Sequence, residues 1–236
     1  MKKRVVYVNG SFVDEDKAKV SVFDRGFLFA DAVYEVTAII DGKILEWDGH
    51  VKRLERSLKE LDMKFPISET KLLNIHFDLI KKNTLKEGLI YLQVTRGEDD
   101  RSFDYPDESV KPTLVLFTQV KSLAESNIAK TGLKVISVPD MRWGRRDIKT
   151  VQLLAPSMCK MMAKKKNKDD AWMIQDGFIT EGTSNNAYII TKDNVLITRN
   201  LSNDILAGVT RRSILRYAKE AQIKIKERPF TIDEAV

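Results

Sequence analysis

Four short turns divide much of the chain into pairs of strands. Asn9-Gly10, Asp41-Gly42, Asp176-Gly177 and Asp193-Asn194 each separate two runs of mainly β-branched, aromatic and aliphatic residues. Asn-Gly and Asp-Gly favour two-residue turns whose twist matches that of the flanking strands. We therefore expect four β-hairpins, two in each half of the chain.

Amphipathic helices are expected between the hairpins. Val51, Leu54 and Leu58 recur at helical spacing ahead of Pro66, and such spacing places them on one buried face. Further helices are predicted over residues 72–82, 152–166 and 207–221. The predicted strands are 5–8, 11–13, 20–23, 32–40, 43–46, 89–95, 113–120, 133–138, 171–175, 178–180, 187–191, 195–198 and 224–227.

The segment 121–131 has the Ser, Asn and Lys content of a linker. We place the domain boundary there, between an N-terminal α/β domain over residues 1–120 and a C-terminal domain over residues 132–236. The mixture of strands and helices predicts an α+β or α/β protein.

The last residues carry a helix-start signal. Thr231-Ile232-Asp233-Glu234 is a capping box, but only Ala235 and Val236 follow it, and so short a helix does not hold itself together. We therefore expect the C-terminal domain to be incomplete at its end.

Composition limits the function classes. Hydrophobic residues make up 43% and charged residues 31%, with a net charge of +6, as in a globular enzyme that handles anionic small molecules. Asp169 and Asp170 end the basic tract 164–168, so no nucleic-acid partner is expected. A single cysteine, Cys159, and the lack of an export signal or membrane-length apolar run predict a cytoplasmic protein. We assign no metal site.

A basic segment in the middle of the chain suggests chemistry. Four cations, Arg142, Arg145, Arg146 and Lys149, lie within nine positions, and Val151 and other apolar residues follow. Burial and like charges both disfavour the ammonium form of a lysine, which makes its amine a nucleophile able to form a Schiff base. The alternative interpretation is an ordinary solvated basic loop.

Three other features suit the same site. Glu181 stands at a strand end beside Gly182, which permits a sharp bend. Gly208-Val209-Thr210 opens a helix, where backbone N–H groups suit a phosphate, and the guanidinium of Arg53 could complete that site. Taken singly, these are a turn acid, a helix cap and a surface charge. Together with Lys149 they suit pyridoxal 5′-phosphate, which needs a lysine, an anion for its ring nitrogen and a phosphate cradle.

Ordered motifs along nearly the whole chain resemble those of fold-type IV pyridoxal-phosphate aminotransferases, most closely the D-amino-acid aminotransferases. The motifs are Arg25-Gly26-Phe27, Asp31-Ala32-Val33-Tyr34-Glu35-Val36, His50-Val51-Lys52-Arg53-Leu54, Arg146-Asp147-Ile148-Lys149, Thr180-Glu181-Gly182-Thr183-Ser184-Asn185 and Gly208-Val209-Thr210-Arg211. The resemblance implies a small N-terminal α/β domain, a larger C-terminal domain with barrel-like strands, and a homodimer with the cofactor in the cleft between domains.

The resemblance also implies residue roles toward the cofactor. Lys149 forms the Schiff base and then shuttles the α-proton. Glu181 pairs with the pyridinium, while Arg53, Val209 and Thr210 hold the phosphate.

On the substrate side, the resemblance places Tyr34 in the substrate pocket and Arg101 in the position that traps the α-carboxylate. From the residues alone, Tyr34 could be a packed strand aromatic and Arg101 a mobile surface arginine. Phe103 stands where the D-specific enzymes carry a histidine. Since a phenyl ring donates no hydrogen bond, D-stereospecificity is less firmly indicated than transamination.

The expected activity is therefore ping-pong transamination between a D-alanine-like amino acid and a 2-oxo acid. Branched-chain L-amino-acid aminotransferases and an aminodeoxychorismate lyase-like enzyme remain alternatives on the same fold. A non-catalytic binding protein on this scaffold is a further alternative, because a fold does not fix a function.

Overall fold

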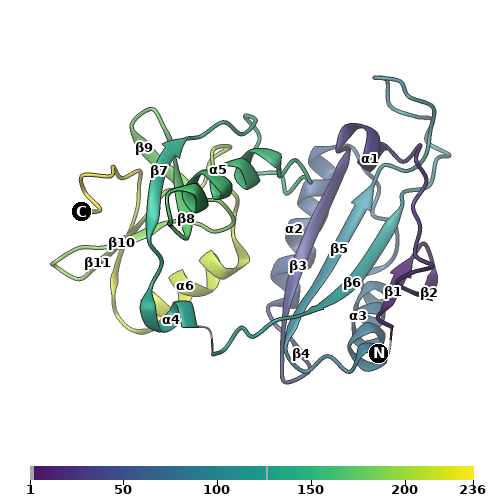
Figure 1. Cartoon of the computed structure of the whole chain (residues 1–236), viewed down its shortest axis with the longest axis horizontal. Helices are drawn as coiled ribbons and strands as arrows, with labels where there is room; N and C mark the ends of the chain where they lie inside the picture. Colours follow the sequence, from purple (N-terminus) through teal and green to yellow (C-terminus); the bar gives the residue numbers. More distant parts are fainter. Residues whose placement is uncertain (1–2, 126) are drawn as a thin grey trace. The chain divides into compact units, whose positions relative to one another are not determined.

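The computed structural model describes residues 3–125 and 127–236, which form two compact units. The first unit is Met1–Ser126 with Lys149–Val151, and the second is Asn127–Ile148 with Gln152–Val236 (Figure 1). The division falls inside the segment 121–131. However, the sequence assigned everything after residue 131 to the second domain, whereas Lys149–Val151 belongs to the first unit.

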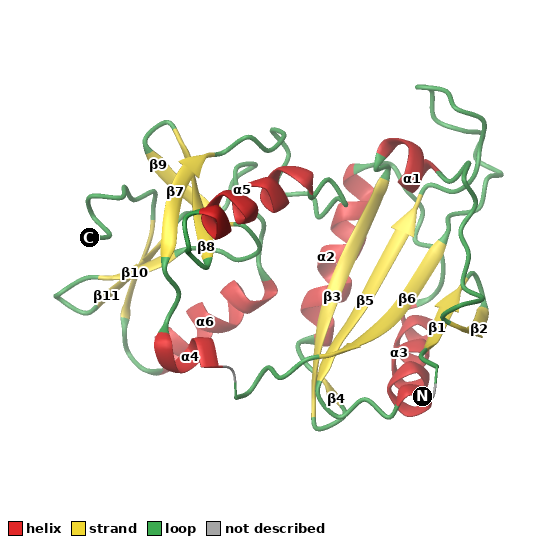
Figure 2. Cartoon of the chain, in the orientation of Figure 1, coloured by secondary structure: helices red, strands yellow, loops and turns green. Residues whose placement is uncertain are grey.

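The first unit contains a six-stranded antiparallel sheet in the order β2-β1-β6-β5-β3-β4. Its strands are β1 (Val5–Val8), β2 (Ser11–Asp14), β3 (Ala32–Ile40), β4 (Lys43–Ile44), β5 (Gly88–Thr95) and β6 (Leu114–Val120). Its helices are α1 (Arg25–Phe29), α2 (Trp47–Glu60) and α3 (Glu69–Asn83). Figure 2 shows α2 and α3 along one face of this sheet.

Alternation along the strands explains this layering. In β3 the odd-numbered residues from Val33 to Ile39 are buried, and the even-numbered ones from Tyr34 are only partly buried. Successive side chains of a strand point to opposite faces, so one face packs against the helices. Leu54 and Leu58 of α2 and Leu79 of α3 are almost fully buried in this core.

The outer edge of β3 explains why Lys149–Val151 joins the first unit. The short β4 pairs only with Ile39 and Ile40, which leaves the start of that edge open. There Thr150 forms a β-bridge with Val33, and the N–H of Val151 donates to the carbonyl of Ala32 at 3.1 Å. The open strand edge therefore draws this segment, a long-range pairing that local sequence patterns do not reveal.

The second unit contains two three-stranded sheets, β7-β8-β9 and β10-β11-β12. Its strands are β7 (Val135–Pro139), β8 (Asp170–Gln175), β9 (Phe178–Gly182), β10 (Tyr188–Ile190), β11 (Val195–Thr198) and β12 (Lys224–Glu227), and its helices are α4 (Asn127–Thr131), α5 (Leu154–Lys165) and α6 (Val209–Glu220). Cys159 and Ala163 of α5 pack on Met173 of β8 in one core. In a second core the fully buried Phe230 packs with Ile179 and Ile197.

Three local predictions differ from the structure. Residues 20–23 form no strand: Val22 and Phe23 are exposed, and the next residue, Asp24, caps α1 by accepting the N–H of Gly26 at 2.8 Å. Helix α1 itself and helix α4, within the predicted linker, were not expected. Helices this short carry too few residues for a periodic signal.

The C-terminal capping box forms its bonds without a helix. The N–H of Thr231 donates to Glu234 at 3.2 Å, and the N–H of Glu234 donates to the Thr231 hydroxyl at 3.2 Å. Only turns follow Thr231. The reciprocal bonds therefore form among these four residues.

In the described part of the chain, no helix has the length and apolar character needed to cross a membrane.

Candidate active site

Lys149 lies on the first unit beside Tyr34. The carbonyl of Lys149 accepts the N–H of Tyr34 at 3.0 Å, and its own N–H donates to the hydroxyl of Ser57 at 3.3 Å. The side chain is partly buried, with Nζ 4.2 Å from the centroid of the Tyr34 ring. The structure thus joins the candidate amine to the aromatic residue predicted to line the substrate pocket.

Tyr34 begins a row of rings on the sheet face opposite the helices. It stacks on Tyr91 of β5 at 5.7 Å between centroids, and Tyr91 stacks on Phe117 of β6 at 4.8 Å. Burial raises the pKa of Tyr91 to about 12, with a further contribution from Tyr34. The Tyr91 phenol therefore stays neutral near pH 7, and the row of three stacked rings starts at Tyr34, beside Lys149.

Arg53 is held by a carboxylate. Its Nε and Nη2 each donate to Glu35 at 2.7 Å, and Nδ1 of His50 lies 2.7 Å from the same carboxylate. Burial alone would raise the pKa of Glu35, but hydrogen bonds from Arg53 and His50 and the charges of Arg53 and Lys149 hold it below its ordinary value. Glu35 is therefore an anion that fixes the direction of the Arg53 guanidinium.

Sequence reasoning assigned no role to Glu35 or His50. A signal was present, because Glu35 occupies a core-facing position of β3 between Val33 and Thr37. A buried carboxylate needs a cation, and His50 and Arg53 are one helical turn apart on α2. Their spacing predicts a shared partner once the strand face is known.

Arg101 lies in the long loop between β5 and β6. It is exposed, and its guanidinium carbon lies 5.5 Å from the ring centroid of Phe29 and 5.6 Å from that of Phe103. Phe103 therefore contacts the predicted carboxylate-binding arginine with its ring.

In the second unit, Glu181 lies near the end of β9 with a buried side chain. Asn186 donates to it at 3.0 Å and the N–H of Leu206 at 3.2 Å, and Arg142 makes a short hydrogen bond to its other oxygen. Burial raises the pKa of Glu181, and the charge of Arg142 opposes this. A buried carboxyl whose pKa is raised suits a partner that carries a proton, such as a pyridinium.

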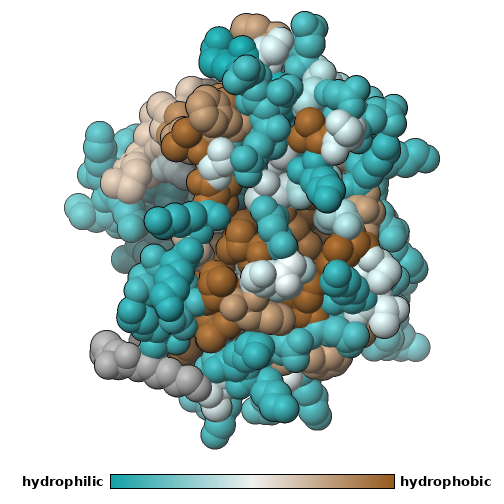
Figure 3. All heavy atoms as spheres, turned by 90° about the vertical axis from the view of Figure 1, so that its right-hand side faces the viewer, coloured by the Kyte–Doolittle hydropathy of each residue, from teal (hydrophilic) through white to brown (hydrophobic). Residues whose placement is uncertain are grey.

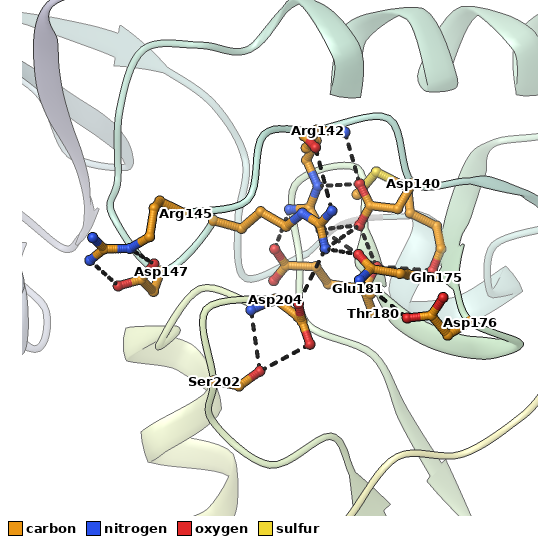
Figure 4. Close-up of polar contacts among 12 residues, drawn as sticks. Asp140, Arg142, Arg145, Asp147, Gln175, Asp176, Thr180, Glu181, Ser202 and Asp204 are labelled. Carbon is orange, nitrogen blue, oxygen red and sulfur yellow. Dashed lines mark hydrogen bonds and ion pairs between the residues drawn. The ribbon is translucent and has the colours of Figure 1, made fainter.

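Arg142 also forms a hydrogen-bonded ion pair with Asp140, as Figure 4 shows. Its Nε donates to Asp140 at 3.0 Å and its Nη2 at 2.7 Å, and Thr180 donates to the same carboxylate at 2.6 Å. Burial disfavours the charge of Asp140, yet the bonds from Arg142 and Thr180 keep its pKa low. Arg142 thus bridges two buried carboxyl groups.

These contacts correct one interpretation of the sequence. The arginines before Lys149 were expected to crowd its amine with positive charge. Instead, Arg142 and Arg146 form ion pairs with Asp140, and Arg145 pairs with Asp147 at 3.0 Å. Carboxylates therefore compensate their charges inside the second unit.

The start of α6 lies next to the Glu181 cluster. Asn186 donates both to Glu181 and to the carbonyl of Leu206, two residues before Gly208. Gly208 is the N-cap and no side chain caps the helix; a Cβ there would lie 2.1 Å from the Asn186 side-chain oxygen. Val209 is buried and Thr210 is exposed. The helix start therefore leaves its N–H groups to an outside acceptor such as a phosphate.

Two groups of predicted residues are thus brought together. The first unit joins Lys149, Tyr34 and, through Glu35, Arg53; the second joins Glu181 and the Val209-Thr210 helix start through Asn186. The role of Asn186 was not predicted, although it directly follows the predicted motif ending at Asn185. No cluster of potential metal ligands occurs among the described residues.

Comparison with known proteins defines the class. The family model for amino-transferase class IV matches residues 32–235, a span that contains Lys149, Arg53, Glu181 and the start of α6. The chain therefore belongs to this family and is an aminotransferase, as the motifs predicted.

Matches to individual proteins are more specific than the match to the family model. The chain is 39% identical over 230 residues to the D-alanine aminotransferase of Staphylococcus epidermidis and 36% identical over 228 residues to that of Staphylococcus aureus; both matches cover 97% of this chain and 80% of the relative. The solved branched-chain amino acid aminotransferase of Escherichia coli has a TM-score of 0.86 at 21% identity, covering 98% of this chain and 79% of that one. The latter likeness shows the fold, and the predicted fold-type IV architecture is confirmed.

Proposed function

We propose that the chain transfers the amino group between a D-amino acid similar to D-alanine and a 2-oxo acid such as 2-oxoglutarate or pyruvate. The observation that carries this proposal is the extent of the match to D-alanine aminotransferases, which spans 97% of the chain. Phe103 is the feature that makes the stereochemistry worth testing directly.

The cofactor of this class is pyridoxal 5′-phosphate, and the residues present fit it. Two observations support the fit: no side chain caps the start of α6, and the carboxyl of Glu181 is buried. When bound, the cofactor supplies an aldehyde that takes up the amino group and a ring that accepts the electrons of the substrate Cα.

We assign the cofactor contacts residue by residue. Lys149 binds the aldehyde, Glu181 receives the ring N–H, and Val209 and Thr210 at the helix start hold the phosphate. Arg53, whose direction is fixed by Glu35, supplies a further cation for the phosphate.

On the substrate side, Nζ of Lys149 would take the proton from the substrate Cα and hold it for its return to carbon. The ring of Tyr34 lies against this nitrogen and limits its movement. Arg101 binds the α-carboxylate and so determines which face of the substrate presents its proton.

Two further expectations remain proposals. The exposed side chains of Val22 and Phe23 in the first unit, together with an apolar patch in Figure 3, support a homodimer, which sedimentation would test. A cytoplasmic location is supported by the unpaired, buried thiol of Cys159.

The test is an absorbance spectrum of the purified protein before and after adding D-alanine and, separately, L-alanine, followed by steady-state assays with D-alanine, L-leucine and aminodeoxychorismate. We expect a cofactor band that D-alanine converts and L-alanine leaves unchanged, with turnover on D-alanine. Turnover on L-leucine alone would assign the branched-chain activity, and pyruvate release from aminodeoxychorismate the lyase activity. A colourless protein without a borohydride-trappable adduct would support the non-catalytic alternative.

A further inference from the structure

Cationic and aromatic side chains of α1 and of the loop that carries Arg101 alternate in space. Arg96, Tyr105, Arg25, Phe29, Arg101 and Phe103 follow one another in space, with guanidinium carbon to ring centroid distances of 3.7, 5.9, 4.6, 5.5 and 5.6 Å. We call these six residues the ladder. All five distances fall within the range of cation–π attraction. Phe29 and Phe103 also meet edge to face at 5.7 Å.

The inner end of the ladder is anchored in the fold. Asp31 accepts Nε of Arg25 at 2.9 Å and Nε of Arg96 at 2.7 Å. Arg96 also donates to the carbonyl of Leu61, just after α2, at 2.7 Å. Arg25 and Arg96 are only 3% and 9% exposed, so this end is fixed by buried, charge-assisted bonds.

Arg25 connects this anchor to the loop backbone. Its Nη1 donates to the carbonyls of Ser102 at 2.8 Å and Asp104 at 3.1 Å. These residues flank Phe103, directly after Arg101. One buried side chain therefore fixes the backbone of the segment that presents both residues.

The outer end leaves Arg101 available to a ligand. Its guanidinium makes no hydrogen bond or ion pair within residues 3–125 and 127–236, and it contacts the rings of Phe29 and Phe103. The ring contacts give its N–H groups no oxygen or nitrogen acceptor, so these groups remain available to a ligand. Two N–H groups on one edge match the two oxygens of a carboxylate.

From this geometry we propose that Phe103 and Arg25 are positioning residues that hold Arg101 for the substrate carboxylate. The inference rests on the proposed function and specifies how its substrate is bound. Phe103 provides a ring face in place of a hydrogen-bond donor, and Arg25 provides the backbone anchor. The side chain that departs from the D-specific pattern thus serves the same carboxylate indirectly.

The test compares Phe103→Leu with Phe103→Tyr in the cofactor-loaded enzyme. Phe103 is 82% exposed, so neither change threatens the fold. Leucine removes the ring face, and we expect KM for both the amino acid and the 2-oxo acid to rise about 2- to 5-fold. The kcat and the pyridoxal phosphate affinity should stay unchanged, and Phe103→Tyr should restore the wild-type KM. The matched control is Phe27→Leu, a similarly exposed phenylalanine outside the ladder.

Two further measurements separate this proposal from the proposed function. In an Arg101→Met background, Phe103→Leu should add nothing to KM; a persistent effect, or a wild-type KM in Phe103→Leu, would overturn the proposal. The rate of trypsin cleavage after Arg101 tests the ladder independently of enzyme activity. This rate should be higher in Phe103→Leu than in Phe27→Leu. If the wild-type protein showed no transamination, the proposed function would fail, and equal cleavage rates would then also reject the ladder.

Discussion

Arg142 is the residue whose importance is clearest from its contacts. It lies between two buried carboxyl groups, Asp140 and Glu181, and its side chain is 11% exposed. Removal of one member of a buried ion pair leaves an uncompensated charge. Here the removal of one guanidinium leaves two carboxyl groups without their shared cation.

We therefore predict that Arg142→Met lowers the free energy of unfolding by about 3–5 kcal/mol at pH 7. Equilibrium urea denaturation of the purified protein measures this value. The control is Arg56→Met on α2: Arg56 and its partner Glu60 are 43% and 35% exposed, so the loss should be at most about 1 kcal/mol. Equal losses in the two variants would contradict the special position of Arg142.

The pH dependence of the Arg142→Met deficit follows from the same contacts. In the wild type the pKa of Asp140 is lowered, so its stabilising contribution is present above its ordinary range near 3.8 and is lost as pH falls through the folded value. Without Arg142, burial raises the pKa of both carboxyl groups, and their ionisation then destabilises the fold. The deficit should grow as pH rises from about 4 to 7.

At the residue scale, the sequence selected candidate side chains but did not show what each of them contacts. Lys149 and Tyr34 were both selected, and they lie together. Arg53 was selected for a phosphate, but its contact with the Glu35 carboxylate depends on which face of β3 lies inward. The inward face of β3 is a property of the tertiary structure, so no local sequence pattern could predict this contact.

At the scale of elements, Gly97 determines how the Arg101 loop leaves β5. Its φ is +108°, and a Cβ would lie 2.3 Å from the backbone carbonyl oxygen of Lys111. Gly10 has a nearly equal φ of +101°, but a Cβ there would meet nothing within 4 Å. A comparison of alanine substitutions at the two glycines therefore distinguishes the cost of backbone strain from the cost of a steric clash.

We predict that Gly10→Ala costs about 1–3 kcal/mol of stability through backbone strain alone. Gly97→Ala should cost more, because the two chain segments that meet at Gly97 and Lys111 must also separate. Thermal or urea unfolding of both variants gives the comparison. A loss at Gly97 no larger than that at Gly10 would mean that the loop base shifts without penalty.

Most elements were predictable, and the exceptions have physical causes. Strands such as β5 and β6 alternate buried and partly buried residues, and α2 repeats its apolar face, so their periods were visible. Helix α1 has five residues and depends on the Asp24 cap. It was not predicted, because a capped single turn has no period.

At the scale of the whole molecule, the chain order of the site residues hides how they are grouped. Lys149 lies late in the sequence but belongs to the first unit, whereas Glu181 and the start of α6 belong to the second. Lys149 belongs to the first unit because the open edge of β3 pairs with the segment that carries it. The sequence showed the family and its fold, but not this pairing, which joins residues more than a hundred positions apart.

The account as a whole depends on Lys149 being the lysine that binds the cofactor. The most direct measurement is borohydride reduction of the cofactor-loaded protein, followed by peptide mass spectrometry, with Lys149→Ala as the control. We predict a single phosphopyridoxyl group on Nζ of Lys149 and none in the variant. A label on another lysine, or an unchanged label in Lys149→Ala, would contradict the assignment.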